Sequence, residues 1–148
     1  MKTAHLIVMS AALLGAMGAA HALVFKSVGA APAVLYDAPS PKGRKVFVAP
    51  RGMPVEVVLT YGEWVKVRDM AGDLAWVQSR SLAPRRNVVV NASSARVRAS
   101  AEDNAPVAFT AEKGVLLELL EPAASGWAKV RHRDGQTGFV RVAEIWGE

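Results

Sequence analysis

The feature that most constrains this chain is an internal repeat. Residues 45–82 align with residues 107–145 at an offset of 62, which rises to 63 after one inserted residue. Matched positions keep their order and their residue class, as in Phe47 with Phe109, Gly52 with Gly114, Trp64 with Trp127 and Gly72 with Gly135. Because self-similarity at a fixed period marks repeated structural units, the sequence predicts two copies of one small domain. We place them at residues 23–82 and 88–148, with a junction at residues 83–87.

Each copy has the pattern of short β-strands. In "PVEVVL" of the first copy, Val55 and Val57 alternate with Glu56, and "WVKVR", "VLLELL" and "WAKVR" follow the same kind of pattern. Such alternation is typical of half-buried antiparallel strands, and Asp134-Gly135 favours the tight turn of a hairpin. The sequence therefore predicts an all-β protein that consists of two tandem small β-barrels, with about five short antiparallel strands in each.

The first residues have the pattern of an export signal. Lys2 precedes the apolar stretch "LIVMSAALLGAMGAA", and Ala20 and Ala22 are small residues at the positions that a signal peptidase reads. We expect residues 1–22 to be a signal peptide, cleaved between Ala22 and Leu23. The mature protein is then periplasmic or otherwise exported, without stable membrane insertion. The alternative is a retained membrane anchor, because the apolar run approaches the roughly 20 residues that a spanning helix needs.

The composition leaves few groups for chemistry. The chain has no cysteine and three histidines, of which only His132 lies beyond the expected signal. A disulfide and a Cys-His pair are thereby excluded, and a histidine metal site would have to be built on one imidazole. We expect no cofactor, no metal and no enzymatic activity. The alternative is a cell-wall hydrolase that uses Asp69 and Asp73 as paired carboxylates, but these lie on a tight turn.

The net charge of the chain is compatible with more than one class of binding partner. The full chain carries a net charge of +5, and the excess of basic residues lies in the first copy and the junction. Such an excess is ordinary for solubility, and it also suits anionic polymers of the cell envelope. We do not expect a nucleic acid as partner, because export and a small charge argue against one. The oligomeric state stays open.

Both copies carry the same short motifs in the same order. The first contains Gly52-x-x-Val55-x-Val57, then Trp64-x-x-Val67, then Gly72-x-x-x-Trp76-Val77. The second contains Gly114-x-x-Leu117, Trp127-x-x-Val130 and Gly135-x-x-Gly138-Phe139-Val140. This order resembles the bacterial Src-homology-3 (SH3b) domain family. The resemblance implies two SH3-like barrels that act as an exported, non-catalytic binding module for peptidoglycan or an envelope protein. The alternative function is a structural or signalling domain that meets a membrane-protein partner.

Aromatic residues without an aromatic counterpart in the other copy are the better ligand candidates, because the shared fold does not need them. Tyr36, Tyr61 and Trp146 meet this condition. Trp64 recurs as Trp127, and both are expected in the cores, with a role at a groove edge as the alternative that keeps Trp64 among the candidates.

Two further recurring aromatics stand in the last strand of each copy. Trp76 and Phe139 each precede a matched valine. On that ground we expect both rings to belong to the cores.

The basic loop "PKGRK" belongs to the first copy alone. It contains Lys42, Arg44 and Lys45, where the second copy has uncharged residues. The loop is either simply solvated or a site for carboxylates or phosphates of the envelope. The neighbours expected for such a site are Arg51, Arg85 and Arg86.

Overall fold

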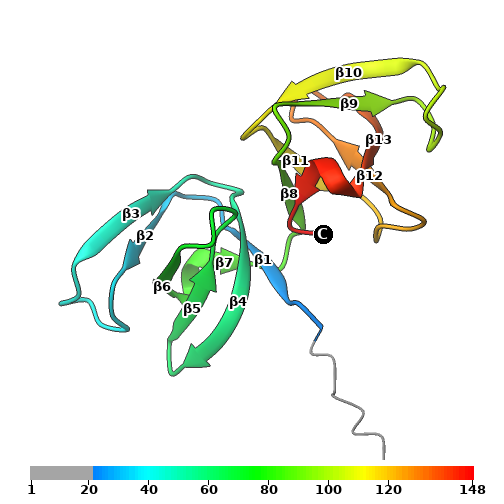
Figure 1. The fold of residues 1–148 in the computed structure, drawn as a ribbon. Helices are drawn as coiled ribbons and strands as arrows, with labels where there is room; N and C mark the ends of the chain where they lie inside the picture. The colour runs from blue at the N-terminus through cyan, green and yellow to red at the C-terminus, as the bar shows by residue number, and fades with distance from the viewer. Residues whose placement is uncertain (1–21) are drawn as a thin grey trace, which may run out of the picture.

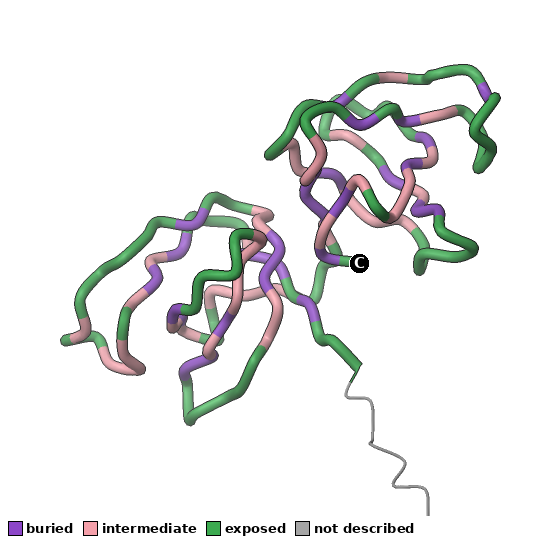
Figure 2. Tube along the Cα trace, in the orientation of Figure 1, coloured by how far each residue is buried: buried purple, intermediate pink, exposed green. Residues whose placement is uncertain are grey.

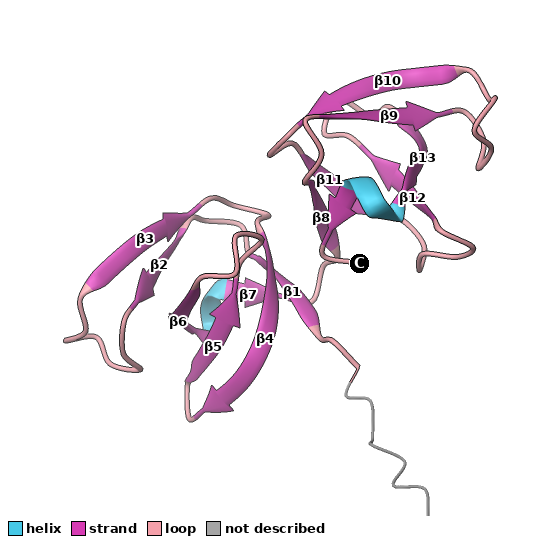
Figure 3. Cartoon of the chain, in the orientation of Figure 1, coloured by secondary structure: helices cyan, strands magenta, loops and turns pink. Residues whose placement is uncertain are grey.

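The computed structural model describes residues 22–148, which fold into two antiparallel β-sheets of seven strands each (Figures 1 and 3). The expected signal peptide lies, except for Ala22, outside the described residues. Within this part of the chain, no helix is long and apolar enough to cross a membrane. Its helical segments are single 3-10 turns at Ser79–Ser81 and Val142–Glu144. The predicted all-β fold of two tandem units is confirmed.

The first unit contains seven strands, more than the number predicted. They are β1 (Phe25–Val28), β2 (Ala33–Tyr36), β3 (Lys45–Ala49), β4 (Pro54–Tyr61), β5 (Trp64–Arg68), β6 (Leu74–Gln78) and β7 (Leu82–Ala83). Their order in the sheet is β3-β2-β6-β5-β4-β1-β7. Strands β1 and β7 pair with each other, so the two ends of the unit lie side by side. Alternation does not reveal them because four and two residues are too few to show a period.

The second unit repeats this arrangement. Its strands are β8 (Asn87–Val90), β9 (Ser94–Arg98), β10 (Val107–Glu112), β11 (Leu116–Leu119), β12 (Trp127–Arg131), β13 (Thr137–Arg141) and β14 (Ile145–Trp146). The order is β10-β9-β13-β12-β11-β8-β14, in which every strand takes the place of its counterpart in the first sheet. Equal topology in both halves is what a duplicated sequence requires.

Each unit has its own valine-rich core, and Figure 2 shows the buried segments alternating with exposed ones along the strands. In β5 and β6, Val65, Val67 and Val77 point inward and are at most 3% exposed. The matching buried residues of β12 and β13 are Ala128, Val130 and Val140. Full burial of a valine contributes about 1.5 kcal/mol or more to stability, so these alternating positions hold each barrel together.

The expectation that Trp76 and Phe139 belong to the cores was wrong. Both rings are only partly buried and lie outside the two core clusters, because the valine that follows each of them takes the inward position of the alternation. Trp64 and Trp127 are buried, at 9% and 8% exposure. They too alternate with inward residues, so other side chains must cover them from outside the barrel.

The two units touch through the junction and the chain ends. The Asn87 side-chain amide donates a hydrogen bond to the Gly52 carbonyl oxygen at 2.9 Å, and the Asn87 backbone N–H donates to Ser27 Oγ at 3.2 Å. Phe25 of β1 meets Trp146 of β14 edge to face, with ring centroids 5.1 Å apart. These contacts join the start of each sheet to the other unit.

Candidate functional site

Rings on the outer side of β2, β6 and β5 form a surface of the first unit that we call the aromatic face, defined as Tyr36, Trp64 and Trp76. Tyr36 lies opposite Trp76 in the sheet, and Trp76 lies opposite Lys66. The Tyr36 and Trp64 rings meet edge to face, with centroids 5.3 Å apart. Lys66 Nζ lies 5.9 Å from the centroid of the Trp76 ring. Strand pairing thus gathers rings that are far apart in the sequence.

The three rings have different roles. Trp64 is buried and forms the floor, whereas Tyr36 and Trp76 keep part of their surface open to solvent. An edge-to-face pair contributes about 0.5–1.5 kcal/mol beyond burial, so the Trp64 ring holds Tyr36 in a fixed orientation. Trp76 and Lys66 were not among the sequence-based candidates. Cross-strand register, which a single sequence does not show, is the signal that would have found them.

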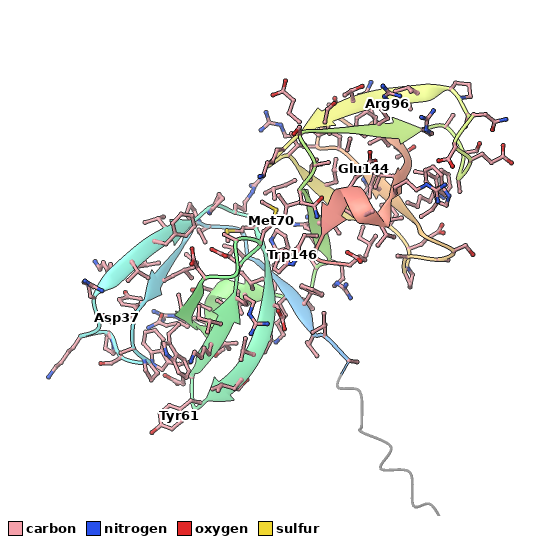
Figure 4. The ribbon with its side chains drawn as sticks, in the orientation of Figure 1. Asp37, Tyr61, Met70, Arg96, Glu144 and Trp146 are labelled. Atoms are coloured by element: carbon pink, nitrogen blue, oxygen red, sulfur yellow. The ribbon has the colours of Figure 1, made fainter. Side chains whose placement is uncertain are left out.

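Tyr61 lies at the rim of this face. It is the last residue of β4 and the cross-strand partner of Trp64, and it is 66% exposed. Figure 4 shows its side chain at the tip of the first unit, directed away from the barrel. Tyr61 therefore borders the aromatic face on the side of β4 and leaves Tyr36 and Trp76 partly open to solvent.

The basic loop between β2 and β3 is ordered by Asp37, which is labelled in Figure 4. Its Oδ1 accepts a hydrogen bond from the Arg44 backbone N–H at 2.8 Å, and its Oδ2 lies 3.5 Å from Arg44 Nε. Lys45 is the cross-strand partner of Tyr36. The structure thus brings Lys45 beside the aromatic face, leaves Lys42 exposed in the loop, and partly neutralises Arg44.

The corresponding face of the second unit is ionic. Arg141 takes the position of Gln78 and lies over the Trp127 ring, with its guanidinium carbon 4.2 Å from the centroid. Arg141 Nε donates to Asp103 Oδ1 at 3.0 Å, and this hydrogen bonding holds the pKa of the Asp103 carboxyl below its ordinary value. Arg98 stands in place of Tyr36. Arg141 therefore covers Trp127 where Tyr36 covers Trp64, so this face carries an edge-to-face ring pair in the first unit and a guanidinium over a ring in the second.

The three arginines that were predicted to lie near the basic loop are found in other parts of the structure. Arg51 and Arg85 line a cleft between the two units, apart from the basic loop. Arg86 Nη2 donates to the Gly147 carbonyl oxygen at 3.2 Å and its guanidinium lies over the Phe25 ring. Trp146, the third aromatic residue without an aromatic counterpart in the other copy, packs edge to face against Phe25. The expected grouping of the arginines with the basic loop was therefore wrong.

The two carboxylates weighed for catalysis, Asp69 and Asp73, lie on one turn. Asp69 Oδ1 accepts a hydrogen bond from the Asp73 backbone N–H at 2.9 Å, which closes a turn. His132 Nδ1 lies 3.0 Å from Asp134 Oδ2, and the pKa of Asp134 is lowered mainly by the backbone N–H of Gln136. Among residues 22–148, no group of three or more His, Asp or Glu side chains is placed to hold a metal ion.

Comparison with known proteins locates the family. A family model described as "Bacterial SH3 domain" matches the chain twice, at residues 29–84 and 91–147. No curated protein matches the sequence. Similar solved structures include NlpC1 from Trichomonas vaginalis, at 12% identity and a TM-score of 0.40, over 95% of this chain and 51% of that one. NlpC2 from the same organism matches at 11% and 0.40, over 86% and 49%. The chain thus spans about half the length of each.

Proposed function

The chain belongs to the bacterial SH3 domain family, whose members are binding modules, and on that premise we propose that it is an exported, non-catalytic module for a cell-envelope ligand. The ligand is peptidoglycan or an envelope protein. It lies across the aromatic face of the first unit, with Lys42 and Lys45 contacting its carboxylates. The observation that carries this proposal is the edge-to-face pair of Tyr36 and Trp64 beside a cationic loop that the second unit lacks.

The chemistry of this surface suits an extended ligand. Fixed aromatic rings offer large apolar area at low entropic cost, and the tyrosine hydroxyl adds a polar contact. Lysines next to the rings attract carboxylates, which occur on the peptides of peptidoglycan and on acidic protein segments. One surface can thus bind an apolar group and an anionic group of the same ligand.

One observation favours an envelope protein over peptidoglycan. Strand β3 is an edge of the first sheet, and Val46, Phe47 and Val48 on it are 45%, 48% and 61% exposed. An apolar edge strand with unpaired backbone groups is able to accept an added strand from another protein. This is the surface that a structural or signalling domain would use to meet a membrane-protein partner.

Co-sedimentation with purified peptidoglycan sacculi tests the proposal. We expect the protein to pellet with sacculi at low salt, and we expect Tyr36→Ala to lose most of this binding because it removes the exposed ring. Replacement of Lys42, Arg44 and Lys45 by Gln should also weaken binding. The loss should be larger at low salt than at high salt, because salt screens the attraction between charges.

A matched variant controls for net charge. Lys26, Arg96 and Lys113 are exposed basic residues outside the aromatic face, and their replacement by Gln removes the same charge. Equal loss of binding in both triple variants would contradict a site at the loop. If the unaltered protein stays in the supernatant at low salt, peptidoglycan is not the ligand, and crosslinking in envelope extracts with and without the β3 variant Phe47→Lys then tests the protein partner.

A further inference from the structure

A second candidate site lies between the two units. A cleft of about 1030 Å³ separates the turn before β4 in the first unit from β11 and the β12–β13 hairpin in the second. The junction contributes Ala83, Arg85 and Asn87 to its lining. None of the residues of the aromatic face or of the basic loop lines it, so the cleft is distinct from the surface described above.

Arginines dominate the charge of the cleft. Those that line it are Arg51, Arg85, Arg131 and Arg133, and the lining contains one carboxylate, Glu118. Arg131 donates to Glu118 Oε2 from Nη2 at 2.7 Å, and Arg85 Nη2 donates to Oε1 at 3.2 Å. The hydrogen bond from Arg131 above all holds the pKa of Glu118 below its ordinary value. Glu118 is therefore ionised at neutral pH and is shared by two arginines.

Two arginines of the cleft remain without such a partner. Among residues 22–148, no carboxylate lies within ion-pair distance of the Arg51 or Arg133 side chain, and neither side chain makes a hydrogen bond. Both residues are exposed, and they come from different units. His132 also lines the cleft, but its Nδ1 already faces Asp134. The charge left unbalanced is thus positive and comes from both sides.

Direct contacts join the two units beside the cleft. Asn87, which lines the cleft, donates hydrogen bonds to the Gly52 carbonyl oxygen and to Ser27 Oγ of the first unit. At Gly52, with φ at +82°, an added Cβ would lie 3.1 Å from Asn87 Nδ2 and 3.7 Å from Leu116 Cδ1. The backbone of the first unit therefore packs directly against the junction and β11.

We propose that this cleft binds a multiply charged oxyanion, with phosphate or carboxylate groups, that bridges the two units through Arg51 and Arg133. A guanidinium is always charged and presents a planar set of donors that matches both groups. Two such donors on opposite units favour a ligand with two anionic groups over a single one. A cleft lined by charge of one sign also concentrates counter-ions of the other sign.

Isothermal titration calorimetry of the purified protein tests this inference with two probes, inorganic pyrophosphate and citrate. We expect a one-to-one complex with at least one probe at low salt, weakened as salt is raised. The probe that binds more tightly identifies the group, phosphate or carboxylate. R51Q and R133Q should each weaken binding about tenfold, because hydrogen bonds to a charged ligand contribute that much or more.

The double variant R80Q/R96Q is the matched control. It removes two exposed arginines that do not line the cleft, so it should bind as the unaltered protein does. Absence of binding of both probes at low salt overturns the inference, as does unchanged binding in R51Q/R133Q. Neither cleft arginine contributes to the aromatic face, so a failure here leaves the sedimentation result untouched, and the reverse also holds.

Discussion

Trp64 and Trp127 occupy the same position of the repeat, yet side chains from different strands cover them. Both are buried on the outer side of the barrel. Tyr36 covers Trp64 edge to face, whereas the Arg141 guanidinium covers Trp127. Differences at two strand positions, Tyr36 against Arg98 and Gln78 against Arg141, thus separate an aromatic surface from an ionic one above the same buried ring.

The buried ring makes a first prediction. Trp64→Ala should lower the free energy of unfolding by about 3–5 kcal/mol, because it removes a large buried side chain and leaves a void under Tyr36. Urea denaturation followed by Tyr and Trp fluorescence measures this loss. Trp76→Ala is the control, since that ring is only partly buried and should lose clearly less. Equal losses would mean that Trp64 is not the floor of the face.

At the scale of strands, the two units differ at one position where two neighbouring strands of the sheet pack closely. Gly138 of β13 stands where the first unit has Ala75. A Cβ added at Gly138 would lie 2.6 Å from the Arg98 carbonyl oxygen and 2.7 Å from Val97 Cγ1. No real Cβ fits at these distances, so β13 and β9 pack closely because residue 138 has no side chain.

This close approach predicts the effect of one methyl group. Gly138→Ala should destabilise the second unit by about 1–3 kcal/mol, because the backbone of β9 has to move. The reverse change in the first unit, Ala75→Gly, creates no clash and should cost about 0.5–1 kcal/mol through backbone entropy. Thermal unfolding of the two variants compares them. A Gly138→Ala protein as stable as the parent would contradict the close packing.

At the scale of the whole molecule, a few polar and aromatic contacts fix one barrel against the other. Asn87 is the central one, because its side chain and its backbone both bond to the first unit. Phe25 and Trp146 add an aromatic contact between the beginning of one sheet and the end of the other. The cationic cleft exists only while these contacts hold.

Removal of the Asn87 side chain should therefore loosen the pair of units. In Asn87→Ala we expect the two barrels to stay folded but to tumble with different correlation times, as measured by NMR relaxation, because the hydrogen bond to Gly52 is lost. Asn91→Ala is a matched control, since the Asn91 amide donates to Ile145 within the second unit. Unchanged tumbling in Asn87→Ala would show that the aromatic contact suffices.

Part of the candidate site could be predicted from the sequence. Tyr36 and Lys45 were selected because the other copy lacks them, and the structure places them opposite each other in the sheet. Trp76 was assigned to the core because a valine follows it. Period-two alternation divides a strand into two faces but does not say which face is inward, and here the valines take the inner one.

The duplication, the all-β fold and the alternating valines of both cores follow from the amino-acid sequence alone, because they depend on local patterns that recur along the chain. The three-dimensional arrangement sets which rings share a surface and which arginines share a cleft. Both groupings depend on cross-strand register and on the packing of one barrel against the other, as in the edge-to-face pair of Tyr36 with Trp64 and in the cleft that Arg51 and Arg133 both line.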